Sequence, residues 1–130
     1  MLLLDTLGEL LEVLPVARGV FVGGTIAPVG GHNMLEPAIF ATPVAFGPHT
    51  ENVTAAAAAL LEAGAAVEVR DAAALSAEWR RLLSEPAASV EMGRRGRAVV
   101  AAGAAVAEHT FDVVRPWLGS VAPTGASAVA

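Results

Sequence analysis

The sequence contains no cysteine, no tyrosine and no lysine. Without cysteine, the chain has neither disulfide bonds nor a thiolate that acts as a nucleophile or metal ligand. All of its basic residues are arginine, and its net charge is −5. Because nucleic-acid binding depends on neutralising phosphates with basic side chains, this charge excludes nucleic acid as the main partner.

Long apolar runs are also missing, although 55% of the residues are hydrophobic. No run approaches the roughly 18 to 20 residues of a membrane-spanning helix. The apolar residues 1–4 lack the basic segment and the length of a signal peptide. We therefore expect a soluble protein. A chain of 130 residues fits one domain, and a domain of this size buries roughly two-thirds of its unfolded surface without needing disulfides.

Short apolar runs alternate with helical segments along the chain. The pattern predicts strands at residues 1–4, 20–22, 43–46 and 66–69, and helices at residues 7–14, 33–40, 55–61, 71–85 and 87–118. This alternation favours an α/β fold with a parallel sheet and helices on both faces. A chain that begins directly in a core strand is expected to be truncated at its N-terminus.

Small polar residues, glycine and proline mark the expected helix ends. Thr6 and Glu9 have the spacing of a capping box, and the helical stripe that continues from them is Leu7, Leu10, Leu11 and Leu14. The other expected signals are a cap at Thr50 or Asn52, a terminator at Gly64, a helix start at Asp71 and breaks at Gly103 and Pro116.

The stretch from Gly23 to Pro37 is the main candidate for a binding site. It follows a predicted strand and holds two glycine pairs, 23–24 and 30–31, which allow backbone N–H groups to approach a ligand closely. His32, Asn33 and Glu36 then open a helix, where N–H groups attract anions. The loops at 6–9, 23–36 and 47–50 all follow strand ends and share one rim of the sheet. We therefore hypothesise an anionic ligand, a nucleotide.

Each candidate also has a simpler structural explanation. Asn33 and Glu36 have the spacing of a helix cap, and a carboxylate with about four lone-pair sites can cap and bind a ligand together. His32 and His49 fit ligand contact better than catalysis, and with Glu36 they have no recognised metal spacing. The glycines match neither a dinucleotide fingerprint nor a P-loop. The cluster of Arg94, Arg95 and Arg97 is best explained as a solvated helix face. Trp79 and Trp117 are best explained as packing residues.

Four linked blocks, at residues 5–10, 21–25, 30–38 and 43–50, carry a family resemblance. The third reads Gly-Gly-His-Asn-Met-Leu-Glu-Pro-Ala and the fourth ends in Gly-Pro-His-Thr. In order and spacing they resemble the C-terminal part of the 3-deoxy-D-manno-octulosonic acid (Kdo) transferases. The resemblance implies a GT-B glycosyltransferase, in which two Rossmann-like domains face a cleft and the C-terminal domain binds the nucleotide of CMP-Kdo.

The resemblance also implies a reaction and its setting. Such enzymes transfer Kdo from CMP-Kdo to a lipid A precursor at the cytoplasmic face of the Gram-negative inner membrane, with which the full-length enzyme associates peripherally. No cofactor and no metal are implied. The acceptor surface and the glutamate base belong to the family's N-terminal domain. No catalytic residue is therefore assigned in this chain, and we expect it to be inactive alone.

The implied nucleotide contacts fall in two segments. Leu7, Gly8 and Glu9 match the first, while the second and the loop before it comprise Gly30, Gly31, His32, Asn33, Met34, Leu35 and Glu36. Glu36 is the implied ribose contact. The chain departs from the family at Leu7, usually methionine, at Met34, usually proline, and at residues 51–53, where Glu-Asn-Val replaces Phe-Asn-Phe. Glu51 is expected to weaken binding of the anionic donor.

We therefore predict a donor-nucleotide domain at residues 1–118 and a disordered tail at 119–130. Two alternatives stay open at this point. One is the donor domain of another GT-B glycosyltransferase that uses a UDP-sugar. The other is a non-catalytic remnant or interaction module whose polar rim serves only to cap helices.

Overall fold

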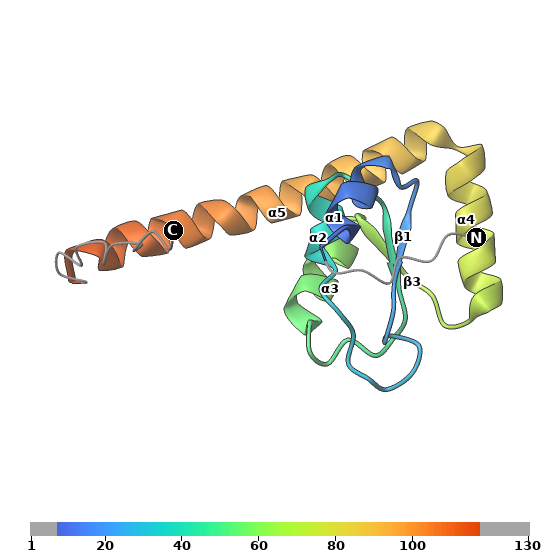
Figure 1. Ribbon diagram of the computed structural model, residues 1–130, viewed down its shortest axis with the longest axis horizontal. Helices are drawn as coiled ribbons and strands as arrows, with labels where there is room; N and C mark the ends of the chain where they lie inside the picture. Colours follow the sequence, from blue (N-terminus) through green and yellow to red (C-terminus); the bar gives the residue numbers. More distant parts are fainter. Residues whose placement is uncertain (1–7, 118–130) are drawn as a thin grey trace, which may run out of the picture.

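The computed structural model describes residues 8–117, which form a parallel sheet covered by helices (Figure 1). The strands β1 (Val20–Val22), β2 (Val44–Phe46) and β3 (Ala66–Glu68) lie in the order β1-β2-β3. Both strand pairs are parallel, so each connection crosses over through helical segments. The predicted α/β fold with a parallel sheet is confirmed. The strand predicted at residues 1–4 lies outside the described residues.

Helices connect the strands and extend the chain beyond them. They are α1 (Leu10–Val13), the 3-10 helix η1 (Leu14–Val16), α2 (Leu35–Ile39), α3 (Thr54–Glu62), α4 (Ala72–Ser84), α5 (Pro86–Val114) and the 3-10 helix η2 (Arg115–Trp117). α4 begins as predicted, because the Asp71 carboxylate accepts a hydrogen bond from the Ala74 N–H at 2.8 Å. α3 ends as predicted before Gly64, which has φ +62°.

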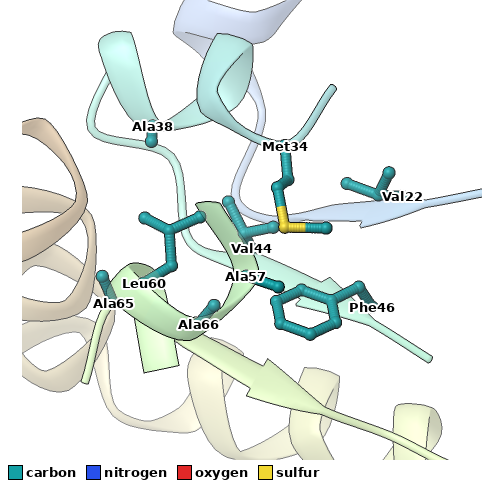
Figure 2. Close-up of a cluster of buried hydrophobic side chains, with 9 residues drawn as sticks. All are labelled: Val22, Met34, Ala38, Val44, Phe46, Ala57, Leu60, Ala65 and Ala66. Atoms are coloured by element: carbon teal, nitrogen blue, oxygen red, sulfur yellow. The ribbon is translucent and has the colours of Figure 1, made fainter. Parts of the chain in front are cut away.

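The main core lies between one face of the sheet and helices α2 and α3 (Figure 2). It consists of Val22, Met34, Ala38, Val44, Phe46, Ala57, Leu60, Ala65 and Ala66. Toward the other face, Val67 of β3 lies beside α4 and the start of α5, and Trp79 of α4 packs on Gly19. The helices therefore lie on both sides of the sheet, as predicted, and Trp79 is a packing residue.

Helix α5 packs closely on α2 and then extends past the rest of the molecule (Figure 1). A Cβ added at Gly93 would collide with the carbonyl oxygen of Ala41, and one at Gly96 would lie 3.3 Å from the Ala38 side chain. Side chains from 101 to 117 are exposed. Within residues 8–117, no helix combines the length and the apolar character that crossing a membrane requires.

Three predictions about the helices are wrong. Gly103 does not break α5, which continues to Val114, because one glycine inside a helix costs only about 1 kcal/mol. Trp117 is 87% exposed and does not pack. Of the stripe residues that the structure describes, Leu14 is buried, whereas Leu10 and Leu11 are 54% and 50% exposed.

Two predicted caps are also wrong. Glu9 occupies the N-cap position of α1 rather than the third helical position, since Gly8 has φ +96° and lies outside the helix. Thr6 and Leu7 lie outside the described residues. Val53 is the N-cap of α3 and makes no side-chain cap bond. The first helix starts later than predicted because Gly8 keeps a non-helical backbone. α3 begins at Thr54, next to the predicted start at residue 55, so only its cap differs from the prediction.

The predicted solvated arginine face on α5 is confirmed. Arg94 and Arg95 hydrogen-bond the Glu91 carboxylate at 2.7 and 2.9 Å and remain largely exposed. The bond from Arg94, and to a smaller extent the bond from Arg95, lower the pKa of Glu91 to about 2. The arginines therefore have a partner on their own helix.

Candidate functional site

The carboxyl ends of β1 and β2 lead into two loops, residues 23–34 and 47–53, which Thr25 joins. The Thr25 hydroxyl donates to the Val22 carbonyl oxygen at 2.6 Å and accepts from the Gly47 N–H at 2.7 Å. The His49 N–H donates to the Thr25 carbonyl oxygen at 2.9 Å. Because the Thr25 side chain is fully buried, the two loops form one packed unit at the rim, as the strand ends predicted.

The turn at Gly30 and Gly31 has a backbone that favours glycine, with φ of +93° and +81°. The Gly31 N–H donates to the Gly24 carbonyl oxygen at 2.9 Å, and the Gly30 carbonyl oxygen accepts from the Asn52 N–H at 3.1 Å. The turn is therefore held on both sides, once within its own loop and once by the neighbouring loop.

The start of α2 is organised by Asn33. Its Oδ1 accepts from the Leu35 N–H at 3.0 Å, while its Nδ2 donates to Glu36 Oε1 at 3.0 Å. Met34 is the residue before the helix, but Asn33 bonds the first N–H of α2 as a cap does. The predicted role of Glu36 in the cap is wrong, because the glutamate takes the asparagine side chain and not a backbone N–H. Glu36 keeps lone pairs that a ligand hydroxyl can use.

A groove of about 460 Å³ runs beside β1 at this rim. Its polar lining is His32, Asn33 and Glu36, which the sequence had marked, and its remaining lining is Leu10, Leu14, Val20, Phe21, Val22, Gly23 and Pro37. Within residues 8–117, the N–H groups of His32 and Asn33 donate to no acceptor. α2 is only five residues long, so its helix dipole contributes little at this rim.

Comparison with known proteins identifies the family. No family model matches the chain. It is 41% identical over 119 residues to the 3-deoxy-D-manno-octulosonic acid transferase of Bordetella pertussis and 32% identical over 115 residues to that of Haemophilus influenzae. These matches cover 91% and 88% of this chain. The C-terminal CMP-Kdo binding domain of WaaA from Acinetobacter baumannii superposes with a TM-score of 0.71 at 30% identity, covering 75% of this chain and 51% of that chain. The chain belongs to the Kdo transferase family.

Within that family the chain corresponds to a part of the protein. It spans 28% of the Bordetella relative and 27% of the Haemophilus relative, and its structural match is a C-terminal domain. The resemblance in the four sequence blocks is thus confirmed, as is the Rossmann-like fold of a GT-B C-terminal domain.

Within residues 8–117, the other predicted contact residues of this Kdo transferase domain do not line the groove. Met34 is fully buried in the core and Leu35 packs against it, so only their backbone groups are left to face a ligand. Gly8 and Glu9 precede α1, whose Leu10 lines the groove. Their contacts, like those of Gly30 and Gly31, stay predictions.

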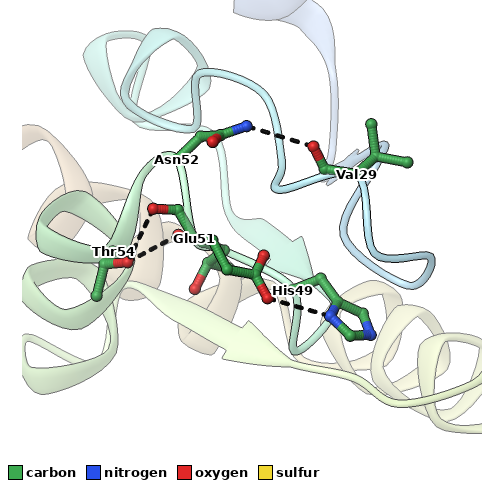
Figure 3. A network of polar contacts seen from close by, with 6 residues as sticks. Val29, His49, Glu51, Asn52 and Thr54 are labelled. Carbon is green, nitrogen blue, oxygen red and sulfur yellow. Dashed lines mark hydrogen bonds and ion pairs between the residues drawn. The ribbon is translucent and has the colours of Figure 1, made fainter.

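One pair in the second loop was missed in the sequence. His49 Nδ1 lies 3.2 Å from Glu51 Oε1 (Figure 3). A backbone hydrogen bond, and to a smaller extent the bond to His49, lower the pKa of Glu51. The Glu51 carboxylate, a predicted departure from the family pattern, is therefore held by a neighbour. Two polar residues in an irregular loop carry no periodicity from which their pairing can be predicted. Across residues 8–117, no three histidine, aspartate or glutamate side chains gather as a metal site.

Proposed function

We propose that this chain is the donor-nucleotide domain of a Kdo transferase and that it binds CMP-Kdo in the groove beside β1. The observation that carries the proposal is the presence of His32, Asn33 and Glu36 on one groove, in a chain whose structural relative is named a CMP-Kdo binding domain. A groove with an apolar floor and a few convergent polar groups is the usual form of a small-molecule site.

In this proposal, the groove residues contact different parts of the nucleotide. The N–H groups of His32 and Asn33 hydrogen-bond the phosphate oxygens. The Glu36 carboxylate accepts from a ribose hydroxyl, and Asn33 holds that carboxylate in place through its 3.0 Å bond. Gly30 and Gly31 bring the backbone of the loop close to the ligand.

The whole enzyme, in this proposal, transfers Kdo to a lipid A precursor by inverting displacement at the anomeric carbon. CMP is the leaving group, and the N–H donors at the rim stabilise the charge that develops on its phosphate. The general base and the acceptor surface come from the part of the relatives that this chain does not match. We assign the reaction no cofactor or metal, and we place the enzyme peripherally at the cytoplasmic face of the inner membrane.

Calorimetric titration of the chain with CMP and with UDP tests the proposal. We expect CMP to bind more tightly. A preference for UDP would point to a UDP-sugar donor domain, and no binding of either would point to an interaction module. The chain alone should transfer no Kdo from CMP-Kdo to a lipid A precursor, and turnover would contradict the division of the site between two domains.

A Glu36→Ala variant tests the role of the carboxylate. A hydrogen bond to a charged group contributes about 1.5–3 kcal/mol, so we expect CMP affinity to fall by about ten- to a hundredfold. Glu62→Ala, at an exposed position at the end of α3, is the control and should keep full affinity. If Glu36→Ala lowers the melting temperature but leaves CMP affinity intact, Glu36 is only a structural residue.

A further inference from the structure

We infer that Asn52 is a positioning residue that clamps the turn at Gly30 and Gly31 and so holds the binding segment in its ligand-ready shape. The part of this inference that concerns CMP rests on the proposed function. The residue itself lies outside both segments assigned to the nucleotide. It stands in the second loop, residues 47–53, next to Glu51.

Asn52 hydrogen-bonds the loop of residues 23–34, the glycine loop, through both its backbone and its side chain. Its N–H donates to the Gly30 carbonyl oxygen at 3.1 Å, and its Nδ2 donates to the Val29 carbonyl oxygen at 3.3 Å (Figure 3). The two loops approach so closely that a Cβ added to Gly30 would collide with Nδ2 of Asn52. Two successive carbonyl groups of the loop are thus fixed by one residue.

The rest of the glycine loop has few other restraints. Its base is fixed by Thr25, and Gly31 is tied back to Gly24. Within residues 8–117, Asn52 supplies the hydrogen bonds that join residues 26–30 to the second loop, and residues 26–29 are exposed. Because glycine has wide backbone freedom, the turn needs an external clamp, and a loop that is already ordered loses less entropy when a ligand binds.

A capping role does not explain the orientation of this side chain. The N-cap of α3 is Val53, and no side chain caps it. The first turn is instead supported by Thr54, whose hydroxyl donates to the Thr50 carbonyl oxygen at 3.0 Å. The Asn52 amide points away from the helix and across to the other loop, as Figure 3 shows.

The test compares two Asn52 variants with a control at the start of α3. Asn52→Ala removes the amide, and Asn52→Asp keeps the shape but has no donor for the Val29 carbonyl. Thr54→Ala removes a hydroxyl from the neighbouring helix start without touching the glycine loop. Residue-resolved amide hydrogen exchange is measured on each free protein, and calorimetry then measures CMP affinity.

In both Asn52 variants we expect faster exchange at residues 29–34 and unchanged exchange in β2 and α3. CMP affinity should fall by about three- to tenfold in Asn52→Ala, the loss expected for one neutral hydrogen bond. Thr54→Ala should leave amide exchange at residues 29–34 and CMP affinity as in the parent chain. Exchange at the start of α3 should become faster.

Unchanged exchange at residues 29–34 in Asn52→Ala would overturn the clamp. Faster exchange with unchanged CMP affinity would overturn its role in binding. If the parent chain binds no CMP, the proposed function fails, whereas exchange on the free protein still decides whether Asn52 holds the turn.

Discussion

Thr25 and Thr42 are buried threonines whose hydroxyls hydrogen-bond backbone groups in neighbouring segments. Thr25 is 0% exposed and links the ends of β1 and β2, while Thr42 is 3% exposed and donates to the Leu14 carbonyl oxygen at 2.9 Å. Both are satisfied by backbone partners, as buried polar groups in native proteins usually are. The two residues differ in how many partners they serve.

We predict that Thr25→Val destabilises the chain more than Thr42→Val. Removing the Thr25 hydroxyl leaves the Gly47 N–H and the Val22 carbonyl oxygen without this partner. Each buried unsatisfied group costs about 1–3 kcal/mol. Urea denaturation should therefore show a loss of about 2–4 kcal/mol for Thr25→Val and about 1–2 kcal/mol for Thr42→Val. Equal losses would mean that the loops are not joined through Thr25.

Residue-scale contacts were the least accessible to prediction from the sequence. The glycine turn and the presence of His32, Asn33 and Glu36 on one groove followed from their position after a strand. The bonds from Gly47 to Thr25 and from Asn52 to Val29 did not, because each joins residues more than 20 positions apart. Local spacing describes caps and stripes, whereas these contacts depend on how two loops meet in three dimensions.

At the scale of elements, α5 shows how one residue type plays two opposite roles. Gly93 lies against the Ala41 carbonyl oxygen, which leaves no room for a side chain, whereas a Cβ at Gly103 would meet nothing within 4 Å. Both glycines lie inside α5 and neither interrupts it, so the predicted break at Gly103 was wrong. What a helical glycine does depends on its neighbour in space, which periodicity cannot show.

Alanine substitution at the two glycines should have opposite effects. Gly93→Ala forces α5 away from the end of α2, and overpacking of this kind costs about 1–3 kcal/mol. Gly103→Ala removes a poor helix former from an open position and should stabilise the chain by up to about 1 kcal/mol. Urea denaturation of both variants, at one temperature and pH, gives the comparison. A loss of stability in Gly103→Ala would show that this part of α5 is packed.

At the scale of the whole molecule, the chain divides into a packed body and a helical extension. The alternation of strands and helices predicted the body, because strand residues such as Val44 and Phe46 are buried against helix residues such as Leu60. The extension was not predicted. Beyond Val106, side-chain pairs such as Arg115 with Asp112 at 2.8 Å, and Arg115 over the Phe111 ring at 5.0 Å, are local to the helix end.

Matched valine substitutions separate the body from the extension. Val44 is 1% exposed at the centre of the sheet, and Val113 is 58% exposed near the end of α5. Val44→Ala removes buried methyl groups and leaves a cavity, so we expect a loss of about 2 kcal/mol or more. Val113→Ala should change the free energy of unfolding by no more than about 0.5 kcal/mol, as at other exposed sites. Denaturation followed by far-UV circular dichroism measures both, and a comparable loss at Val113 would show that the extension is packed in solution and contributes to the cooperative core.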